Sequence, residues 1–362
     1  MPLVAYSKLP TFERLRQEGQ IILDPHRALE QDIRELHIGL LNMMPDAALQ
    51  ATERQFFRLV GQSNQISQFY LHPFTLAELA RGPEAREHVA RHYTSFEEIQ
   101  AVGLDGLIIT GANVTQPDLA LEPFWEPLNK VVEWAYASVT STVCSCLATH
   151  AVLRFRYGQQ RRLMAAKRWG VFRHRVVDRR HPLVNDVDTL FDVPHSRMNE
   201  VTRGQFREAG LHVLVEDEDD GVHLAVSDDR IRLVFLQGHP EYDMASLLKE
   251  YKREVRLYLD GGRADYPPYP ENYLSSQAQA ILTEHRRALA TARARGEAAD
   301  PFPKSLETLI EQGLHNTWHD TARSLIGKWV GVIYQITHQD RKKPFMDRVD
   351  PADPLKLRRF GR

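Results

Sequence analysis

Cysteine is scarce in this sequence, which excludes a small fold held together by disulfides. The 362 residues contain two cysteines, Cys144 and Cys146. A disulfide scaffold needs more cysteines, and a pair separated by a single residue is too close for an ordinary structural bridge. We therefore expect two free thiols in a protein of a reducing compartment, the cytoplasm.

An excess of one charge and a long hydrophobic run are also missing. Lys and Arg number 46 and Asp and Glu number 48, which gives a net charge of −2. A general nucleic-acid-binding protein is normally strongly basic. The longest apolar run, around residues 40–44, is far too short for a membrane span. The N-terminal residues carry charges where a signal peptide needs an apolar stretch. We predict a protein that binds neither nucleic acid nor membranes.

What the sequence does contain is an alternation of short apolar runs with helical patterns. Helical periodicity occupies residues 47–60, 124–137 and 147–157, and buried strands are predicted at 36–43, 66–71, 106–110, 139–144 and 233–236. This alternation predicts an α/β fold, a mostly parallel sheet with helices on both faces of the flavodoxin-like kind. In such sheets ligands bind beyond the carboxyl ends of the strands. We therefore sought reactive residues directly after the strands.

The pattern changes in the second half of the chain. Residues 211–226 read as a β-hairpin around an Asp-Asp-Gly turn. A segment rich in Gly, Pro and Tyr follows Asp260, and helical patterns cover 275–295 and 317–337. We predict a catalytic domain over residues 1–262 and a helical C-terminal extension over 263–362 that packs on it and ends in a basic tail.

The most informative segment is residues 140–150, where a β-rich run meets a helix with no loop between them. This is the layout of a nucleophile elbow, which needs small residues two positions on either side of the nucleophile. Cys144 and Ala148 meet that need around Cys146, whereas Cys144 would lie inside the strand. The start of a helix favours a thiolate at Cys146, and the N–H of Leu147 is placed to stabilise an oxyanion. The alternative is that both cysteines are small buried hydrophobic residues.

A second segment supplies the partners that a catalytic thiol needs. The strand at 233–236 is followed by Gln-Gly-His-Pro-Glu, which contains His239 and Glu241. In extended chain these two side chains point to the same face. A thiol requires a base, and the base requires a group that fixes its orientation. Cys146, His239 and Glu241 are therefore predicted to form a catalytic triad.

Several motifs in this order resemble the homoserine O-succinyltransferase family, which uses the fold of class I glutamine amidotransferases. Besides the Cys146 elbow, they are LNMMP (41–45), DGLIITGA (105–112), PHSR (194–197), GHPEYD (238–243) and WVGVIYQIT (329–337). The resemblance covers most of the chain. It implies that Cys146 attacks the thioester of an acyl-CoA, and that the hydroxyl of homoserine then attacks the acyl-enzyme with His239 as base.

The resemblance also implies residues that bind the substrates. Lys167, Ser196 and Arg253 correspond to positions that hold the amino acid, and a cation such as Arg253 suits a carboxylate. Thr115 corresponds to a position where Gly accompanies succinyl donors and Glu accompanies acetyl donors, so succinyl-CoA is favoured. We expect a homodimer, no metal and no cofactor beyond acyl-CoA as a substrate.

One departure from the family keeps alternatives open. Residues 46–53 lack the Lys-Lys pair that family members often carry after the LMP motif. Acetyl-CoA as donor, another hydroxy amino acid as acceptor, and a glutamine-type amidohydrolase of the same fold are the competing enzymes. A binding module that kept the fold would leave Cys146 buried and unreactive.

Overall fold

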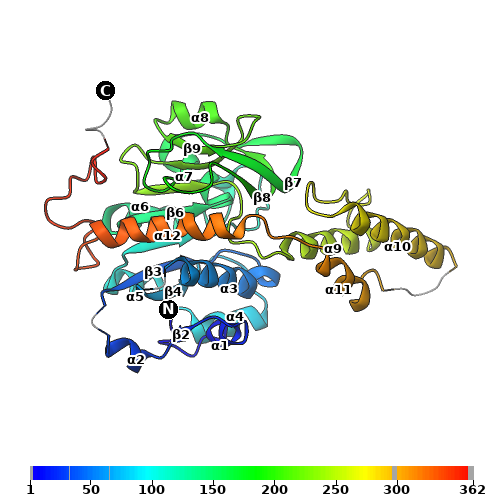
Figure 1. Cartoon of the computed structure of the whole chain (residues 1–362), viewed down its shortest axis with the longest axis horizontal. Coiled ribbons are helices and arrows are strands. Elements are labelled where there is room, and N and C mark those ends of the chain that lie inside the picture. The colour runs from blue at the N-terminus through cyan, green and yellow to red at the C-terminus, as the bar shows by residue number, and fades with distance from the viewer. Residues whose placement is uncertain (1–2, 32, 65, 296–299, 358–362) are drawn as a thin grey trace.

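A single twisted sheet organises the chain. The computed structural model describes residues 3–31, 33–64, 66–295 and 300–357. In these residues eleven strands pair in the order β2-β1-β4-β3-β5-β6-β11-β10-β9-β7-β8 (Figure 1). The final residues of the predicted basic tail, 358–362, lie outside the described residues.

The first seven strands of that order are parallel and include all five buried strands that the sequence predicted from apolar runs. They are β2 (Ile22–Leu23), β1 (Leu3–Val4), β4 (Gln68–Phe74), β3 (Glu35–Leu41), β5 (Gly106–Ile109), β6 (Ser141–Ser145) and β11 (Leu233–Leu236). Short apolar runs suit these strands because both faces of the sheet are buried. The predicted α/β class with a mostly parallel sheet is confirmed.

Alternate residues of the central strands enter two different cores. Ile108 and Val143 join one apolar cluster, whereas Ile109 and Cys144 join another. The first cluster lies under α1 (Pro10–Gln17), α3 (Asp46–Ser63) and α12 (His319–Ile336). The second lies under α5 (Phe96–Val102), α6 (Trp125–Ser138) and α7 (Leu147–Tyr157). Helices therefore cover both faces, as predicted. The other helices before α7 are α2 (Pro25–Leu29), α4 (Pro83–His92) and the 3₁₀ turn η1 (Leu119–Leu121).

The other end of the sheet is antiparallel. The predicted hairpin is confirmed as β9 (His212–Glu216) and β10 (Val222–Val226), with α8 (Arg203–Glu208) before it. The sequence did not predict the two longest strands, β7 (Arg162–Val176) and β8 (Leu190–Glu200). Polar and charged side chains interrupt the alternation in β7, which reads RLMAAKRWGVFRHRV. This ribbon carries Lys167 and Ser196.

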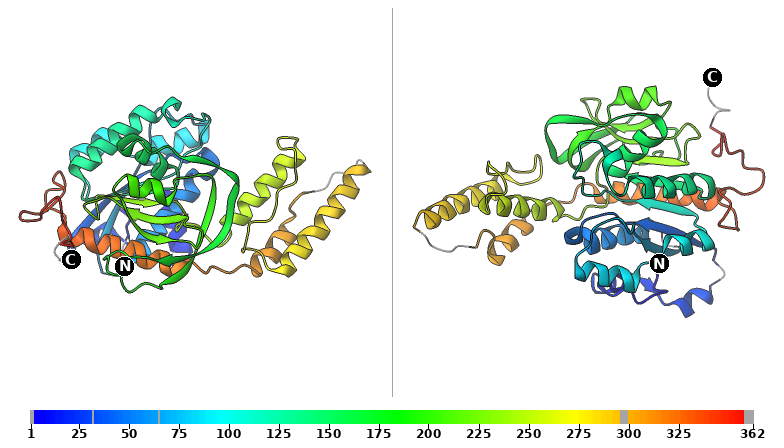
Figure 2. Two further views of the ribbon diagram at one scale, coloured as in Figure 1. Left: turned by 90° about the horizontal axis from the view of Figure 1, so that it is seen from above. Right: turned by 180° about the vertical axis from the view of Figure 1, so that it is seen from behind.

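Three helices form an arm that projects from the sheet in both views of Figure 2. They are α9 (Ser246–Leu259), α10 (Ser276–Ala294) and α11 (Lys304–Gln312). A separate apolar cluster joins them and includes Tyr251, Leu282 and Ile310. Trp169 and Val171 of β7 belong to the same cluster, so the base of the arm rests on the β7–β8 ribbon.

Helix α12 returns from the arm and packs on the sheet beside α3 (Figure 1). Trp329 is buried there, and its indole N–H donates to the Ser141 hydroxyl at 2.8 Å. The division into domains at residue 262 stays a prediction. Among the described helices, none combines the length and apolar composition that crossing a bilayer requires.

Candidate active site

Cys146 occupies a sharp elbow between β6 and α7. Its backbone has φ 51° and ψ −108°, a region that non-glycine residues rarely adopt and that costs about 1–3 kcal/mol. Its own N–H donates to the Leu236 carbonyl at 2.7 Å, which ties the elbow to the end of β11. Leu147 is the first residue of α7, so its N–H belongs to the helix start, where intrahelical acceptors are lacking. The side chain of Cys146 is partly exposed.

Cys144 is different in every respect that bears on reactivity. It lies inside β6, is fully buried, and pairs in register with Ile109 and Phe235. Burial raises the pKa of the Cys144 thiol, which keeps it protonated. The structure therefore places the two cysteines as the sequence predicted, one in the strand and one at its end.

The loops that follow β3 and β5 lie beside the elbow. A Cβ atom added at Gly111 would contact Cys146 Cβ and Leu147 Cβ at 4.0 Å and Met44 Sδ at 3.6 Å. Gly111 belongs to the DGLIITGA motif and Met44 to LNMMP. The carboxyl ends of neighbouring parallel strands thus bring both motifs to Cys146.

His239 and Glu241 complete a triad geometry. His239 Nδ1 lies 2.8 Å from Glu241 Oε1, and both side chains are buried. The ring of His239 stacks on Tyr242 with the centroids 4.3 Å apart, and the His239 N–H donates to the Pro194 carbonyl. With Nδ1 directed at the carboxylate, Nε2 is the ring nitrogen left for Cys146.

The electrostatics of His239 match that arrangement. Burial acts to lower the pKa of His239, but Cys146 and Glu241 outweigh it and hold that pKa well above its ordinary value. Of the two, Cys146 raises the pKa of His239 more than Glu241 does. The protonated form of the His239 imidazole, which lies next to Glu241, is therefore favoured.

A partly buried carboxylate that the sequence reasoning missed, Glu250, joins two of the predicted substrate-binding residues. Its oxygens accept hydrogen bonds at 2.6 Å from the hydroxyls of Ser196 and Tyr242, and Lys167 Nζ lies 3.6 Å away. Burial acts to raise the pKa of Glu250, but Lys167 and the two hydroxyls outweigh it and lower that pKa. Tyr242 also stacks on His239, so this cluster adjoins the triad. Glu250 precedes Arg253 by three residues on α9, one helical turn, which is the signal that could have identified it.

The two predicted cations have different surroundings. Lys167 Nζ lies 4.3 Å from the centroid of the Trp169 ring, and burial lowers the pKa of Lys167. Arg253 has a 58% exposed side chain, and its contact is a 3.5 Å pairing with the adjacent Glu254. The structure thus brings Lys167 and Ser196 together at Glu250, and it leaves the Arg253 guanidinium open to solvent, three residues further along α9.

Thr115 lies on the exposed loop after β5, and Glu122 braces that loop. Glu122 is buried and accepts the backbone N–H groups of Thr115 and Gln116 at 2.5 and 2.6 Å. The Thr115 hydroxyl lies 3.3 Å from the same carboxylate. The carboxylate of Glu122 therefore lies beside Thr115, while residue 115 itself carries no charge.

In the segment that departs from the family pattern, an arginine reaches the LNMMP motif from another loop. Residues 46–53 form the first turns of α3. Arg81 donates to the Met44 carbonyl and lies 3.3 Å from Asp46. A buried cation thus contacts this loop although the lysines are missing.

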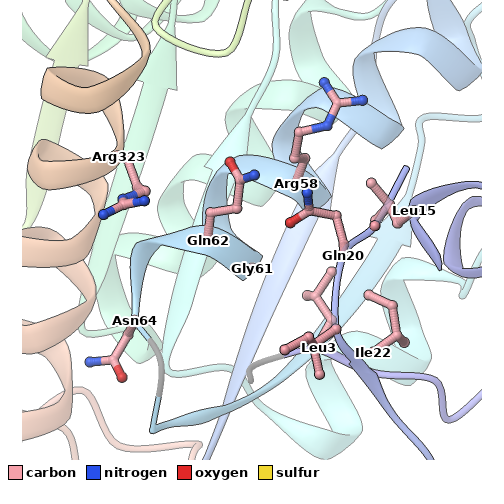
Figure 3. A pocket seen from close by; sticks show the side chains of 11 residues that line it. Leu3, Leu15, Gln20, Ile22, Arg58, Gly61, Gln62, Asn64 and Arg323 are labelled. Atoms are coloured by element: carbon pink, nitrogen blue, oxygen red, sulfur yellow. The ribbon is translucent and has the colours of Figure 1, made fainter. Parts of the chain in front are cut away.

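Two further findings concern possible ligands. Within the described ranges, no group of three or more His, Cys, Asp or Glu side chains could hold a metal ion. A cavity of about 390 Å³ lies between the N-terminal strands, α3 and α12 (Figure 3), and Arg58, Gln62 and Arg323 line it. Its lining includes none of the predicted site residues.

Comparison with known proteins identifies the family to which the chain is similar. The family model described as homoserine O-succinyltransferase matches residues 2–339. The homoserine O-succinyltransferase of Allochromatium vinosum is 67% identical over 357 residues, which cover 99% of each chain. That of Nitrosococcus oceani is 64% identical over 359 residues, again 99% of each chain.

Solved structures of glutamine amidotransferases match the chain at low sequence identity. A glutamine amidotransferase from Thermotoga maritima has 11% identity and a TM-score of 0.44, over 83% of this chain and 98% of that one. A glutamine amidotransferase from Methylobacillus flagellatus has 11% identity and a TM-score of 0.42, over 83% and 95%.

Proposed function

The chain belongs to the homoserine O-succinyltransferase family, and from this membership we propose that it transfers the succinyl group of succinyl-CoA to the hydroxyl of L-homoserine in methionine biosynthesis. The observation that carries the proposal is the match to relatives of that name over 99% of the chain. The direct test is release of free CoA from succinyl-CoA and from acetyl-CoA, with homoserine, serine or glutamine as the second substrate. We expect succinyl-CoA with homoserine to react fastest. No CoA release with any donor and acceptor would contradict the proposal.

The triad supports a mechanism in two steps. In the first, the Cys146 thiolate attacks the thioester carbonyl, the Leu147 N–H stabilises the oxyanion, and the C–S bond to CoA breaks. CoA leaves as a thiol after receiving the proton held by His239. In the second, neutral His239 removes the proton of the homoserine hydroxyl as its oxygen attacks the acyl-enzyme, and Cys146 leaves as thiolate. Glu241 fixes the ring of His239 throughout.

The cluster around Glu250 supports a binding site for a zwitterionic amino acid. A carboxylate complements the ammonium group of homoserine, and Lys167 and Arg253 complement its carboxylate. Ser196 and Tyr242 hold Glu250 in place, and Tyr242 links it to the base His239 by stacking. The acceptor hydroxyl would then be delivered on the His239 side of Cys146. A homodimer and a cytoplasmic location remain expectations for this enzyme.

Replacement of Glu250 tests the acceptor site. Glu250→Gln removes the charge that complements the substrate ammonium while keeping the shape of the side chain. We expect kcat/KM for homoserine to fall about ten- to a hundredfold, the effect of one hydrogen bond to a charged group. The rate of acylation by succinyl-CoA should change little. The control is Glu284→Gln on α10, which is exposed. An equal loss in both half-reactions would contradict an acceptor-specific role.

The pKa of His239 predicts different pH profiles for the two half-reactions. The raised pKa keeps His239 protonated in the free enzyme, so kcat/KM for succinyl-CoA should decline as the pH rises through that pKa. Acylation removes the charge on Cys146, so the pKa of His239 falls in the acyl-enzyme. Since the second step needs neutral imidazole, kcat/KM for homoserine should fall as the pH drops through this lower pKa. Steady-state profiles for each substrate check this, and coincident profiles would contradict it.

A further inference from the structure

Arg161 is a partly buried cation next to the loop that carries Thr115. It follows the end of α7, where Gly158 has φ 67° and turns the chain back toward β7. Arg161 Nη2 donates to the Pro117 carbonyl at 3.4 Å, two residues after Thr115. The same loop and Arg161 line a cavity of about 260 Å³, whose walls are Pro117, Asp118, Leu119, Arg154, Gln160 and Arg161.

Across the described residues, no carboxylate lies within 4.0 Å of the Arg161 guanidinium. The two acidic residues of this region, Glu122 and Asp118, accept hydrogen bonds from backbone N–H groups. Glu122 accepts the N–H groups of Thr115 and Gln116. Asp118 accepts the N–H of Ala120 at 3.0 Å, and its other oxygen lies 3.9 Å from Arg154. The positive charge of Arg161 is therefore available to an anion that enters the cavity.

The Thr115 loop connects Arg161 with the nucleophile, because a Cβ atom added at Gly111 would contact Cys146 Cβ at 4.0 Å and the Pro117 carbonyl accepts from Arg161. Burial lowers the pKa of Arg161, and the charges of Glu122 and Asp118 oppose that effect. Cys146 contributes in the same direction as these two carboxylates. Cys146 and Arg161 lie beyond opposite ends of the same helix, α7, with the Thr115 loop beside both.

A second arginine near Cys146, Arg197, is committed elsewhere. Its Nη1 donates to the Asn199 carbonyl at 2.9 Å and its Nε to His195 Nδ1 at 3.4 Å. His195 Nε2 must then donate to His174 Nε2, because His174 Nδ1 already donates to the Phe172 carbonyl. Arg197 thus anchors a buried chain of neutral imidazoles, whereas Arg161 has a single long bond to a carbonyl.

We propose that Arg161 binds the free carboxylate of the succinyl group while the thioester carbonyl lies at Cys146. This inference rests on the proposed function. A succinyl group carries its carboxylate two methylene groups beyond the thioester carbonyl, and an acetyl group has no such charge. A guanidinium offers paired N–H donors that match a carboxylate. Arg161 would therefore favour a dicarboxylic acyl donor. It contacts the Thr115 loop, which contains the position that the resemblance links to donor choice.

The test compares succinyl-CoA with butyryl-CoA, a donor of the same chain length without the carboxylate. We expect Arg161→Gln to lower kcat/KM for succinyl-CoA about ten- to a hundredfold, the loss of one charge-assisted contact. The rate of acylation by butyryl-CoA, measured as CoA release and as intact mass, should not fall. Arg161→Lys should recover part of the succinyl-CoA activity. The matched control is Arg162→Gln, the adjacent exposed residue, which should leave the donor ratio unchanged.

The outcomes separate the two claims. An unchanged ratio of succinyl-CoA to butyryl-CoA activity in Arg161→Gln, with the wild-type protein acylated by succinyl-CoA, overturns the role of Arg161 alone. An equal loss with both donors also overturns it, because that result indicates damage to the elbow. Failure of wild-type protein to become acylated overturns the proposed function together with this inference.

Discussion

Cys146→Ala is expected to abolish turnover, whereas Cys144→Ala should keep most of it. Cys146 lies on the strained elbow and is partly exposed, and it helps to raise the pKa of His239. Cys144 is fully buried in β6 among apolar neighbours, and burial raises its pKa. CoA release under saturating succinyl-CoA and homoserine measures the contrast.

Stability provides the control for this pair. Removing the Cys144 sulfur leaves a small void in the core, so Cys144→Ala should lower the melting temperature modestly. Cys146→Ala should leave the melting temperature close to that of the wild type, since its side chain is partly exposed. Full activity in Cys146→Ala, or loss of activity confined to Cys144→Ala, would contradict the assignment of the nucleophile.

His239→Asn is expected to lower kcat by about a hundred- to ten-thousandfold, the usual contribution of a positioned acid–base group. Asparagine can still donate to Glu241 in place of Nδ1, so the exchange removes Nε2 while sparing the contact at 2.8 Å. Both half-reactions should slow, because one loses the imidazolium beside the thiolate and the other loses the base. Single-turnover acylation and steady-state turnover together measure this.

His181→Asn serves as the matched control for His239. His181 is also buried, and its Nε2 lies 3.1 Å from the Arg230 carbonyl. We expect a stability loss without a comparable loss of kcat. If His239→Asn lowers the melting temperature as much as His181→Asn does, the loss of activity would be explained by unfolding. His239 would then have a structural role and not a catalytic one.

The parallel strands were predictable because both of their faces are buried, so they read as short apolar runs. The elbow at Cys146 and the pair His239 and Glu241 were predictable for a related reason. Each depends on local chain geometry, a tight turn in one case and the two-residue period of extended chain in the other. The structure places His239 and Glu241 in contact, as expected; their catalytic roles stay predictions.

The ribbon of β7 and β8 and the residues that depend on it were not predictable in the same way. β7 has one face on the arm and carries polar and charged residues along its length, so it shows no clear alternation. Glu250 lies among charged residues on α9, a pattern typical of a solvated helix face. Only the packing of α9 against this ribbon brings Ser196 and Lys167 to its carboxylate.

The most direct test of the central claim is the intact mass of the wild-type protein after mixing with succinyl-CoA in the absence of homoserine. The triad geometry predicts a covalent gain of one succinyl group that is absent in Cys146→Ala and disappears when homoserine is added. An unmodified mass in the wild type, while CoA is still released when homoserine is present, would contradict the acyl-enzyme at Cys146.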